Sequence, residues 1–130
     1  MDLSKFKTDG DLSQNGVVVD IGEGATVTVA RSNNEKFTKS LRATAKKYGR
    51  SFKSLADDKL ERLLMESYCG TVLLNWSGFK KDGEDLPFSR ETAIELLLDK
   101  EYVDLRKLIE DLADEPETFR TEVIEEVVKN

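Results

Sequence analysis

The chain has 130 residues, of which 38% are hydrophobic and 35% are charged, and its formal net charge is −6. This length suits one domain, and the composition excludes an intrinsically disordered chain. The single cysteine, Cys69, excludes an internal disulfide. No apolar run reaches the roughly 20 residues of a transmembrane helix, and the first residues lack the pattern of a signal peptide. We therefore expect a protein of the cytoplasm with no membrane partner.

Charge is distributed unevenly along the chain. Residues 31–62 contain ten basic and four acidic residues, whereas residues 91–130 contain thirteen acidic and five basic residues. A chain with one basic and one acidic section can attract further copies of itself head to tail. The alternative is that both sections are solvated helix faces or pair within one monomer, which is common in helical proteins.

The first 30 residues predict a leader and a hairpin. Residues 1–15 are polar and are expected to form a flexible leader, so that residues 16–130 form a single, mainly helical domain. Within residues 16–30, two β-branched runs are joined by a glycine-containing turn, which predicts an N-terminal β-hairpin. A two-stranded hairpin alone is marginally stable, so we expect it to dock on the helices or on a partner chain.

About five helices are predicted after the hairpin, and the first two carry clear boundary signals. Residues 32–35 have the spacing of a capping box that starts at Ser32, and Gly49 is well placed to end this first helix. Ser54 is expected to cap a second, longer helix that runs to Trp76. This helix becomes apolar on nearly all sides, which predicts a central core helix with Gly70 inside it, at a cost of about 1 kcal/mol relative to alanine.

The second half of the chain predicts one loop and three more helices. Residues 78–88 contain an Asp-Gly turn signal and are expected to form a loop or a tiny hairpin. Ser89 is expected to cap a third helix, which a short break near Asp99 separates from a fourth. Pro116 marks the start of a last helix, because proline is tolerated in the first turn.

No constellation of catalytic residues is apparent. The chain has no histidine, which is the commonest general base and a frequent metal ligand. Cys69 has no histidine to activate it and is expected to fill the core. The Gly-Glu-Gly of residues 22–24 is read as a turn, and the acidic residues of 82–85 lack the EF-hand spacing. We expect a binding protein, not an enzyme, with no catalytic residue, no cofactor and no metal.

Two charged helix faces and one aromatic loop are the candidate interaction sites. They are the basic face of Lys36, Lys39, Arg42 and Lys46, the loop region with Trp76, Phe79 and Phe88, and the acidic C-terminal face of Glu122, Glu125 and Glu126. The basic helix lacks interleaved aromatic residues, and the acidic remainder of the chain would repel phosphate, so no nucleic acid is expected. The alternative for the loop is a connection pinned to the core.

The segment from Trp76 to Ser89 carries a resemblance to a known family. Its Trp-Ser-Gly-Phe stretch, acidic glycine turn and Pro-Phe-Ser lead into the helical pattern of residues 93–97. With the valine-rich hairpin before it and the glutamate-rich end after it, the chain resembles a tail assembly chaperone of lambda-like long-tailed bacteriophages, the siphoviruses.

The resemblance implies a specific function. Such a chaperone binds the tape measure protein in the host cytoplasm, keeps this long chain soluble, helps to recruit the tail tube protein and is absent from the mature virion. It often has a longer form made by a programmed translational frameshift. Self-association into an open or spiral oligomer would suit a long helical partner, because many weak contacts add up. The alternatives are a minor structural tail protein of the virion and a nucleic-acid-binding regulator.

Overall fold

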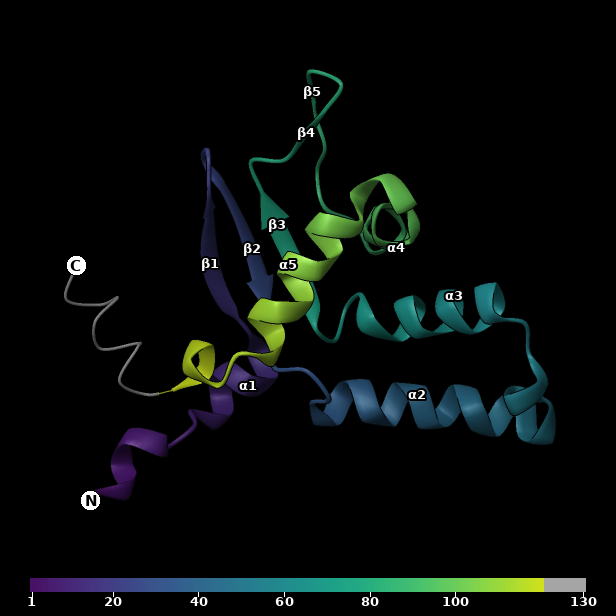
Figure 1. Cartoon of the computed structure of the whole chain (residues 1–130), viewed down its shortest axis with the longest axis horizontal. Coiled ribbons are helices and arrows are strands. Elements are labelled where there is room, and N and C mark those ends of the chain that lie inside the picture. Colours follow the sequence, from purple (N-terminus) through teal and green to yellow (C-terminus); the bar gives the residue numbers. More distant parts are fainter. Residues whose placement is uncertain (121–130) are drawn as a thin grey trace.

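The computed structural model describes residues 1–120 and shows a mixed α/β fold with a helical majority (Figure 1). Helical conformation accounts for 58% of the described chain. Its α-helices are α1 (Gly10–Asn15), α2 (Glu35–Tyr48), α3 (Asp57–Tyr68), α4 (Arg90–Leu98) and α5 (Val103–Asp114). Short 3-10 helices are η1 (Leu3–Phe6), η2 (Gly49–Ser54), η3 (Lys100–Tyr102) and η4 (Pro116–Phe119). The strands are β1 (Val17–Gly22), β2 (Ala25–Val29), β3 (Leu73–Ser77), β4 (Lys80–Lys81) and β5 (Glu84–Asp85).

An antiparallel sheet in the order β1-β2-β3 joins two distant parts of the chain. The first two strands form a hairpin in which Val19 lies opposite Val27, and on the other side of β2 Val27 lies opposite Trp76. Val27 and Val29 are fully buried, so β2 is the central strand by position and by burial. The predicted hairpin is therefore present, but β3 extends it to a three-stranded sheet, and the predicted mainly α fold with an isolated N-terminal hairpin is corrected to a mixed α/β fold.

The predicted long core helix ends early. Helix α3 stops at Tyr68, and Gly70 adopts a φ of +102°, a conformation that glycine accepts and other residues rarely adopt. The segment Leu73–Ser77, in which Leu73, Leu74 and Trp76 are apolar, then forms β3 instead of a last helical turn. A short apolar run is compatible with a buried strand or a buried helix, and periodicity does not distinguish the two. Gly70 therefore marks a turn between helix and strand, which corrects its predicted place inside a helix.

The observed helix caps agree with the predictions at α4 and differ at α2 and α3. Ser89 accepts a hydrogen bond from the Thr92 amide at the start of α4, as predicted. Helix α2 is capped by Asn34, not by Ser32, and α3 follows Ala56 with no side-chain cap from Ser54. Gly49 follows the end of α2, as predicted.

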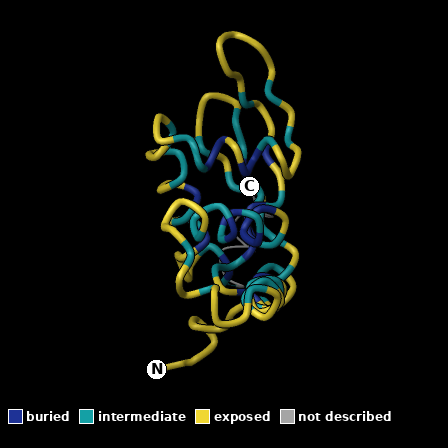
Figure 2. The backbone as a smooth tube through the Cα atoms, turned by 90° about the vertical axis from the view of Figure 1, so that its right-hand side faces the viewer, coloured by how far each residue is buried: buried dark blue, intermediate teal, exposed yellow. Residues whose placement is uncertain are grey.

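The elements are arranged around one core (Figure 1). Helix α5 lies across the sheet, α4 lies beside α5 and α3, and α2 runs alongside α3 on the side away from α4. Figure 2 shows buried residues in the middle of the molecule and exposed residues at its ends. The largest fully buried side chains belong to Phe119, Met65, Leu73, Ile94, Leu97 and Ile109. None of the described helices is long and apolar enough to cross a membrane.

The two ends of the described chain meet. The Asp9 amide donates to the Phe119 carbonyl at 2.9 Å, and Thr8 forms a bridge with Arg120. Residues 1–15, expected to be a leader, contain η1 and α1, and the division of the chain into leader and domain stays a prediction. The predicted last helix is described only as far as η4.

Candidate functional site

Three aromatic side chains that the sequence singled out come together at the end of β3. The Trp76 ring stacks on Phe79 with centroids 4.7 Å apart and meets Phe88 edge to face at 4.9 Å. The Trp76 indole nitrogen donates to the Leu86 carbonyl at 2.7 Å, so the buried polar atom of this residue is satisfied. These contacts fasten both ends of the 78–88 segment to the core, which confirms that the loop is pinned.

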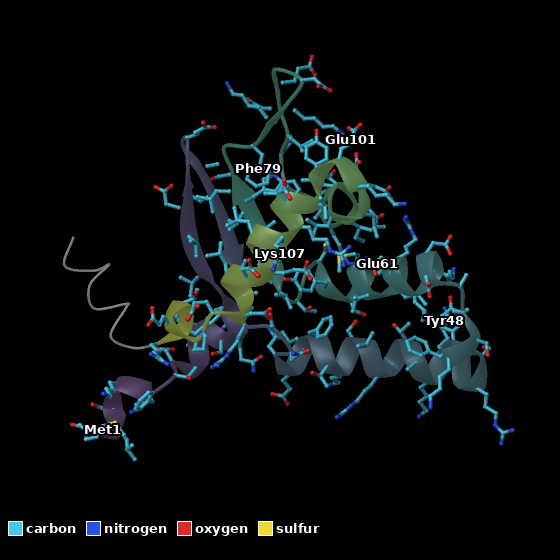
Figure 3. The ribbon with its side chains drawn as sticks, viewed as in Figure 1. Met1, Tyr48, Glu61, Phe79, Glu101 and Lys107 are labelled. Atoms are coloured by element: carbon cyan, nitrogen blue, oxygen red, sulfur yellow. The ribbon has the colours of Figure 1, made fainter. Side chains whose placement is uncertain are left out.

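The pinned segment is a small hairpin that protrudes from the molecule. Strands β4 and β5 pair antiparallel, and Asp82 and Gly83 form the turn between them with positive φ angles, as the Asp-Gly signal predicts. Figure 3 shows Phe79 at the base of this hairpin, where β3 leads into it. The hairpin itself is exposed on both strands.

Two open hollows lie beside the hairpin and together form what we call the hairpin groove. One has a volume of about 460 Å³ and the other about 570 Å³, and both are lined by Lys81, Leu86 and Leu96. The first hollow also contains Phe79 and the β1–β2 turn, and its far wall is made by Tyr102 and Leu105. The Lys81 ammonium lies 5.4 Å from the centre of the Tyr102 ring, which places a cation at the edge of the groove.

Most of this groove was not foreseen from the sequence. Of the predicted site residues, only Phe79 lines it, whereas Trp76 and Phe88 support it from below. Tyr102 and Leu105 lie in the region where the sequence predicts a fourth helix, and the sequence gives no sign that they face the hairpin. The approach of these side chains to the hairpin depends on how α5 crosses the sheet.

The predicted basic residues form a separate surface on α2, which we call the cationic face. Lys36, Lys39, Arg42 and Lys46 are all exposed and recur every three or four residues, so they lie on one side of the helix. None of the four makes an ion pair within the part of the chain that the structure describes. The cationic face is therefore available to an acidic partner.

The acidic charges of the second half of the chain are partly engaged. Arg106 of α5 pairs with Glu61 of α3 and with Glu110, and Lys107 pairs with Asp111. Figure 3 shows Glu61 on α3 and Lys107 on the outer side of α5. The predicted acidic face of Glu122, Glu125 and Glu126 lies outside the described residues.

Cys69 and Tyr68, at the end of α3, are buried and chemically quiet. Burial raises the pKa of the Cys69 thiol to about 12, against a smaller opposing effect of Arg90 and Arg106. Burial also raises the pKa of the Tyr68 hydroxyl, and the nearby charges of Glu110 and Asp114 add to that effect. A thiol that stays protonated is a poor nucleophile, so Cys69 behaves as a core residue.

Comparisons with known proteins give one match. The chain matches the family described as YdaY prophage protein over residues 31–130. No curated protein and no solved structure matches the chain significantly. The match includes α2, α3, the 78–88 segment and α5, but not the β1–β2 turn that completes the hairpin groove. It agrees with the phage part of the resemblance carried by the Trp76–Ser89 segment. The match covers more than half of the chain, so this phage-derived protein belongs to the YdaY prophage protein family.

Proposed function

We propose that this chain is a phage tail assembly chaperone. It binds the tape measure protein in the host cytoplasm, keeps it soluble, helps to recruit the tail tube protein and is left out of the mature virion. One observation carries the proposal: in a chain of a prophage family, the segment that resembles the chaperones, Trp76–Ser89, forms one wall of an open groove that is lined by apolar and charged side chains together. A client that aggregates through apolar surface needs apolar side chains such as those of Phe79 and Leu105 in this groove.

The hairpin groove is suited to short apolar stretches of a helical client. Phe79, Tyr102 and Leu105 offer aromatic and aliphatic contacts to side chains spaced along one helix face. The edge of the groove carries both signs of charge, with Lys80 and Lys81 on the hairpin and Glu91, Glu95 and Asp99 across from them, and would pair with the charged residues that flank such a stretch. Because Trp76 is packed on two rings and hydrogen-bonded, the floor is already formed before the client arrives.

The cationic face supplies the contacts between copies in this proposal. Its four unpaired cations would meet the acidic section of residues 91–130 of a neighbouring copy, in a head-to-tail contact that leaves the array open. Such an array places many hairpin grooves along one long client. Its assembly weakens as salt rises, since exposed charges are screened.

The direct test is co-expression with the tape measure protein encoded in the same phage genome. The soluble, co-purifying amount of tape measure protein is measured with the native chain and with three variants. Lys81→Glu and Tyr102→Ser alter the groove and are expected to reduce the co-purifying amount several-fold. Lys59→Glu makes the same charge change at an exposed position of α3 outside the groove and is expected to have no effect.

Two results would contradict the proposal in different ways. Equal solubility of the tape measure protein with and without this chain would remove the chaperone function. Persistence of the chain in purified phage particles would favour a minor structural tail protein instead. A gel-shift experiment with the native chain and an α2 charge-reversal variant tests the third alternative, a nucleic-acid-binding regulator, through the cationic face.

A further inference from the structure

The first seven residues form an exposed arm that carries much of the apolar surface of the molecule. All of residues 1–7 are exposed, and Met1, Leu3 and Phe6 are 88%, 70% and 51% accessible. The arm begins where Thr8 and Asp9 are tied to residues 119 and 120, and Figure 3 places Met1 far from the rest of the molecule. Three large apolar side chains on one short segment are unusual for a free surface.

The arm also carries more basic than acidic residues. Lys5 and Lys7 make no ion pair in the described structure. The one acidic residue, Asp2, is exposed and accepts a hydrogen bond from the Ser4 amide at 2.9 Å. The arm therefore presents apolar and cationic groups together.

A hollow with the opposite charge lies beside the outer strand of the sheet. It has a volume of about 360 Å³ and is lined by residues 17–20 of β1 and by Glu115, Glu117 and Thr118. We call it the edge hollow, because among the strands of residues 1–120 β1 lies at the edge of the sheet and pairs with β2. Its apolar side is formed by Val17–Val19, with Val18 66% exposed, and its acidic groups are Asp20, Glu115 and Glu117.

An edge strand of three successive valines is a surface that proteins normally protect. Lysine, proline or a bulge at the edge usually prevents pairing with another chain. Here the irregularity in the β1–β2 pairing lies between Asp20 and Gly22, so it leaves Val17–Val19 in regular pairing and Val18 exposed. Within the described chain, the outer edge of β1 faces no further strand, so it offers backbone groups and the Val18 side chain to an incoming extended segment.

We infer that the edge hollow receives residues 1–7 of a second copy of this chain. Met1, Leu3 and Phe6 would lie against Val17–Val19 of the partner copy, and Lys5 and Lys7 would face its acidic groups. The arm leaves the body next to η4, which lines the edge hollow of its own chain. A two-fold axis at this place brings each arm beside the hollow of the other copy, which gives a closed pair by arm exchange.

This contact is separate from the head-to-tail contact through the cationic face, and it does not depend on the proposed function. Two exchanged arms bury less surface than the roughly 800 Å² per partner of a standard interface. The dimer is therefore expected to be weak, with a dissociation constant of about micromolar order. It would double the number of hairpin grooves per particle.

The first experiment swaps charges between the arm and the hollow of the full chain. One variant carries Lys5→Glu and Lys7→Glu, and the other carries Glu115→Lys and Glu117→Lys, which makes the lining of the hollow basic overall. Each variant alone places like charges at both contacts of its own dimer, so its dissociation constant is expected to rise at least tenfold in sedimentation experiments. A mixture of the two variants has opposite charges at both contacts and is expected to dimerise again. A mixture as monomeric as its two components would overturn the inference.

The second experiment locates the arm by cross-linking. Chains with Phe6→Cys are mixed with chains with Val18→Cys and treated with a short bifunctional thiol reagent, to which buried Cys69 is expected to be silent. Covalent dimers are expected from this mixture. Few are expected when Val18→Cys is replaced by Val103→Cys, a valine of similar exposure, 59%, on α5. A cross-link within single chains that carry both Phe6→Cys and Val18→Cys, persisting on dilution, would show the arm in its own hollow and overturn the exchange.

Discussion

The end of the molecule around Trp76 and the α2 helix are built on opposite principles. At the Trp76 end, three rings of one segment, Trp76, Phe79 and Phe88, pack together, and the indole nitrogen is hydrogen-bonded. Helix α2 is longer than α4, but it buries only Phe37, whereas α4 buries four residues. Its outer side carries cations that make no ion pairs in the described part of the chain.

The difference separates stability from recognition. Burial of large side chains supplies most of the folding free energy, so the Trp76 end should unfold only with the whole protein. Helix α2 should open more easily, since little apolar surface holds it to the body. The first region offers a rigid groove and the second an electrostatic surface. The following changes test this contrast, from the largest expected effect to the smallest.

Removal of the Trp76 ring should have the largest effect. The Trp76→Ala substitution leaves a cavity between Phe79 and Phe88 and removes the hydrogen bond to Leu86. We expect the free energy of unfolding to fall by about 3–5 kcal/mol. Urea unfolding followed by circular dichroism measures this change, and a loss below about 1 kcal/mol would contradict the central place of this residue.

A methyl group at Gly78 should be almost as costly. A Cβ there would lie 2.3 Å from the Gly24 carbonyl oxygen of the neighbouring hairpin turn, at a φ of +74°. Gly24 has a similar φ of +79° with open space around it, so Gly24→Ala is a matched control for backbone strain alone. That strain is worth roughly 1–2 kcal/mol. Gly78→Ala is expected to lose at least twice as much stability as Gly24→Ala in the same urea experiment.

The junction between α2 and the body depends on Asn34. Its side chain accepts from the Phe37 amide at 3.0 Å and donates to the Thr71 carbonyl at 2.8 Å, and it is buried. The Asn34→Ala substitution removes the cap and leaves a buried acceptor unpaired, for an expected loss of about 2–3 kcal/mol. Ser89→Ala removes only an exposed cap at α4, so about 1 kcal/mol is expected. Hydrogen exchange should show the larger loss of protection in α2.

Alkaline pH should destabilise the protein through the end of α3. The Cys69 thiol has a pKa raised by burial from 9.0 to about 12, and burial raises the pKa of Tyr68 as well. The unfolded chain therefore releases these protons first, and unfolding becomes more favourable as pH rises. We expect constant stability at pH 7–8 and a decline above about pH 9, of up to ~1.4 kcal/mol per pH unit and group. The decline should be shallower in a Cys69→Ala variant. If stability falls with pH equally steeply in the native chain and in the Cys69→Ala variant, the decline does not come from the Cys69 thiol.

Charge reversal on the cationic face should leave folding almost unchanged. Lys39 and Arg42 are exposed, and their charges pair with no described residue. Lys39→Glu combined with Arg42→Glu should shift the melting temperature by no more than about 2 °C. The same variant should lose salt-sensitive self-association in sedimentation experiments. A large drop in melting temperature would show that α2 is a structural element and not a recognition surface.

The predictions from sequence were most accurate where a signal acts over a few residues. Gly49 after α2, the cap at Ser89 and the turn at Asp82-Gly83 were all predicted, because caps and turns depend on local backbone geometry. The prediction of a phage origin rested mainly on one contiguous segment, Trp76–Ser89, and the family match confirms that origin. The charged surface of α2 follows from helical spacing alone.

Tertiary structure decided what short-range patterns leave open. The apolar residues after Gly70 became a strand because β2 offered a free edge, whereas periodicity alone allowed a helix. Asn34 replaced Ser32 as the cap of α2 because it also reaches the carbonyl of Thr71, 37 positions along the chain. The hairpin groove joins the β1–β2 turn, the 78–88 segment and the start of α5. The sequence by itself determined which residues are apolar, charged or turn-forming. Which of these residues meet was decided by the tertiary structure, because distant segments pair only when the whole core is packed.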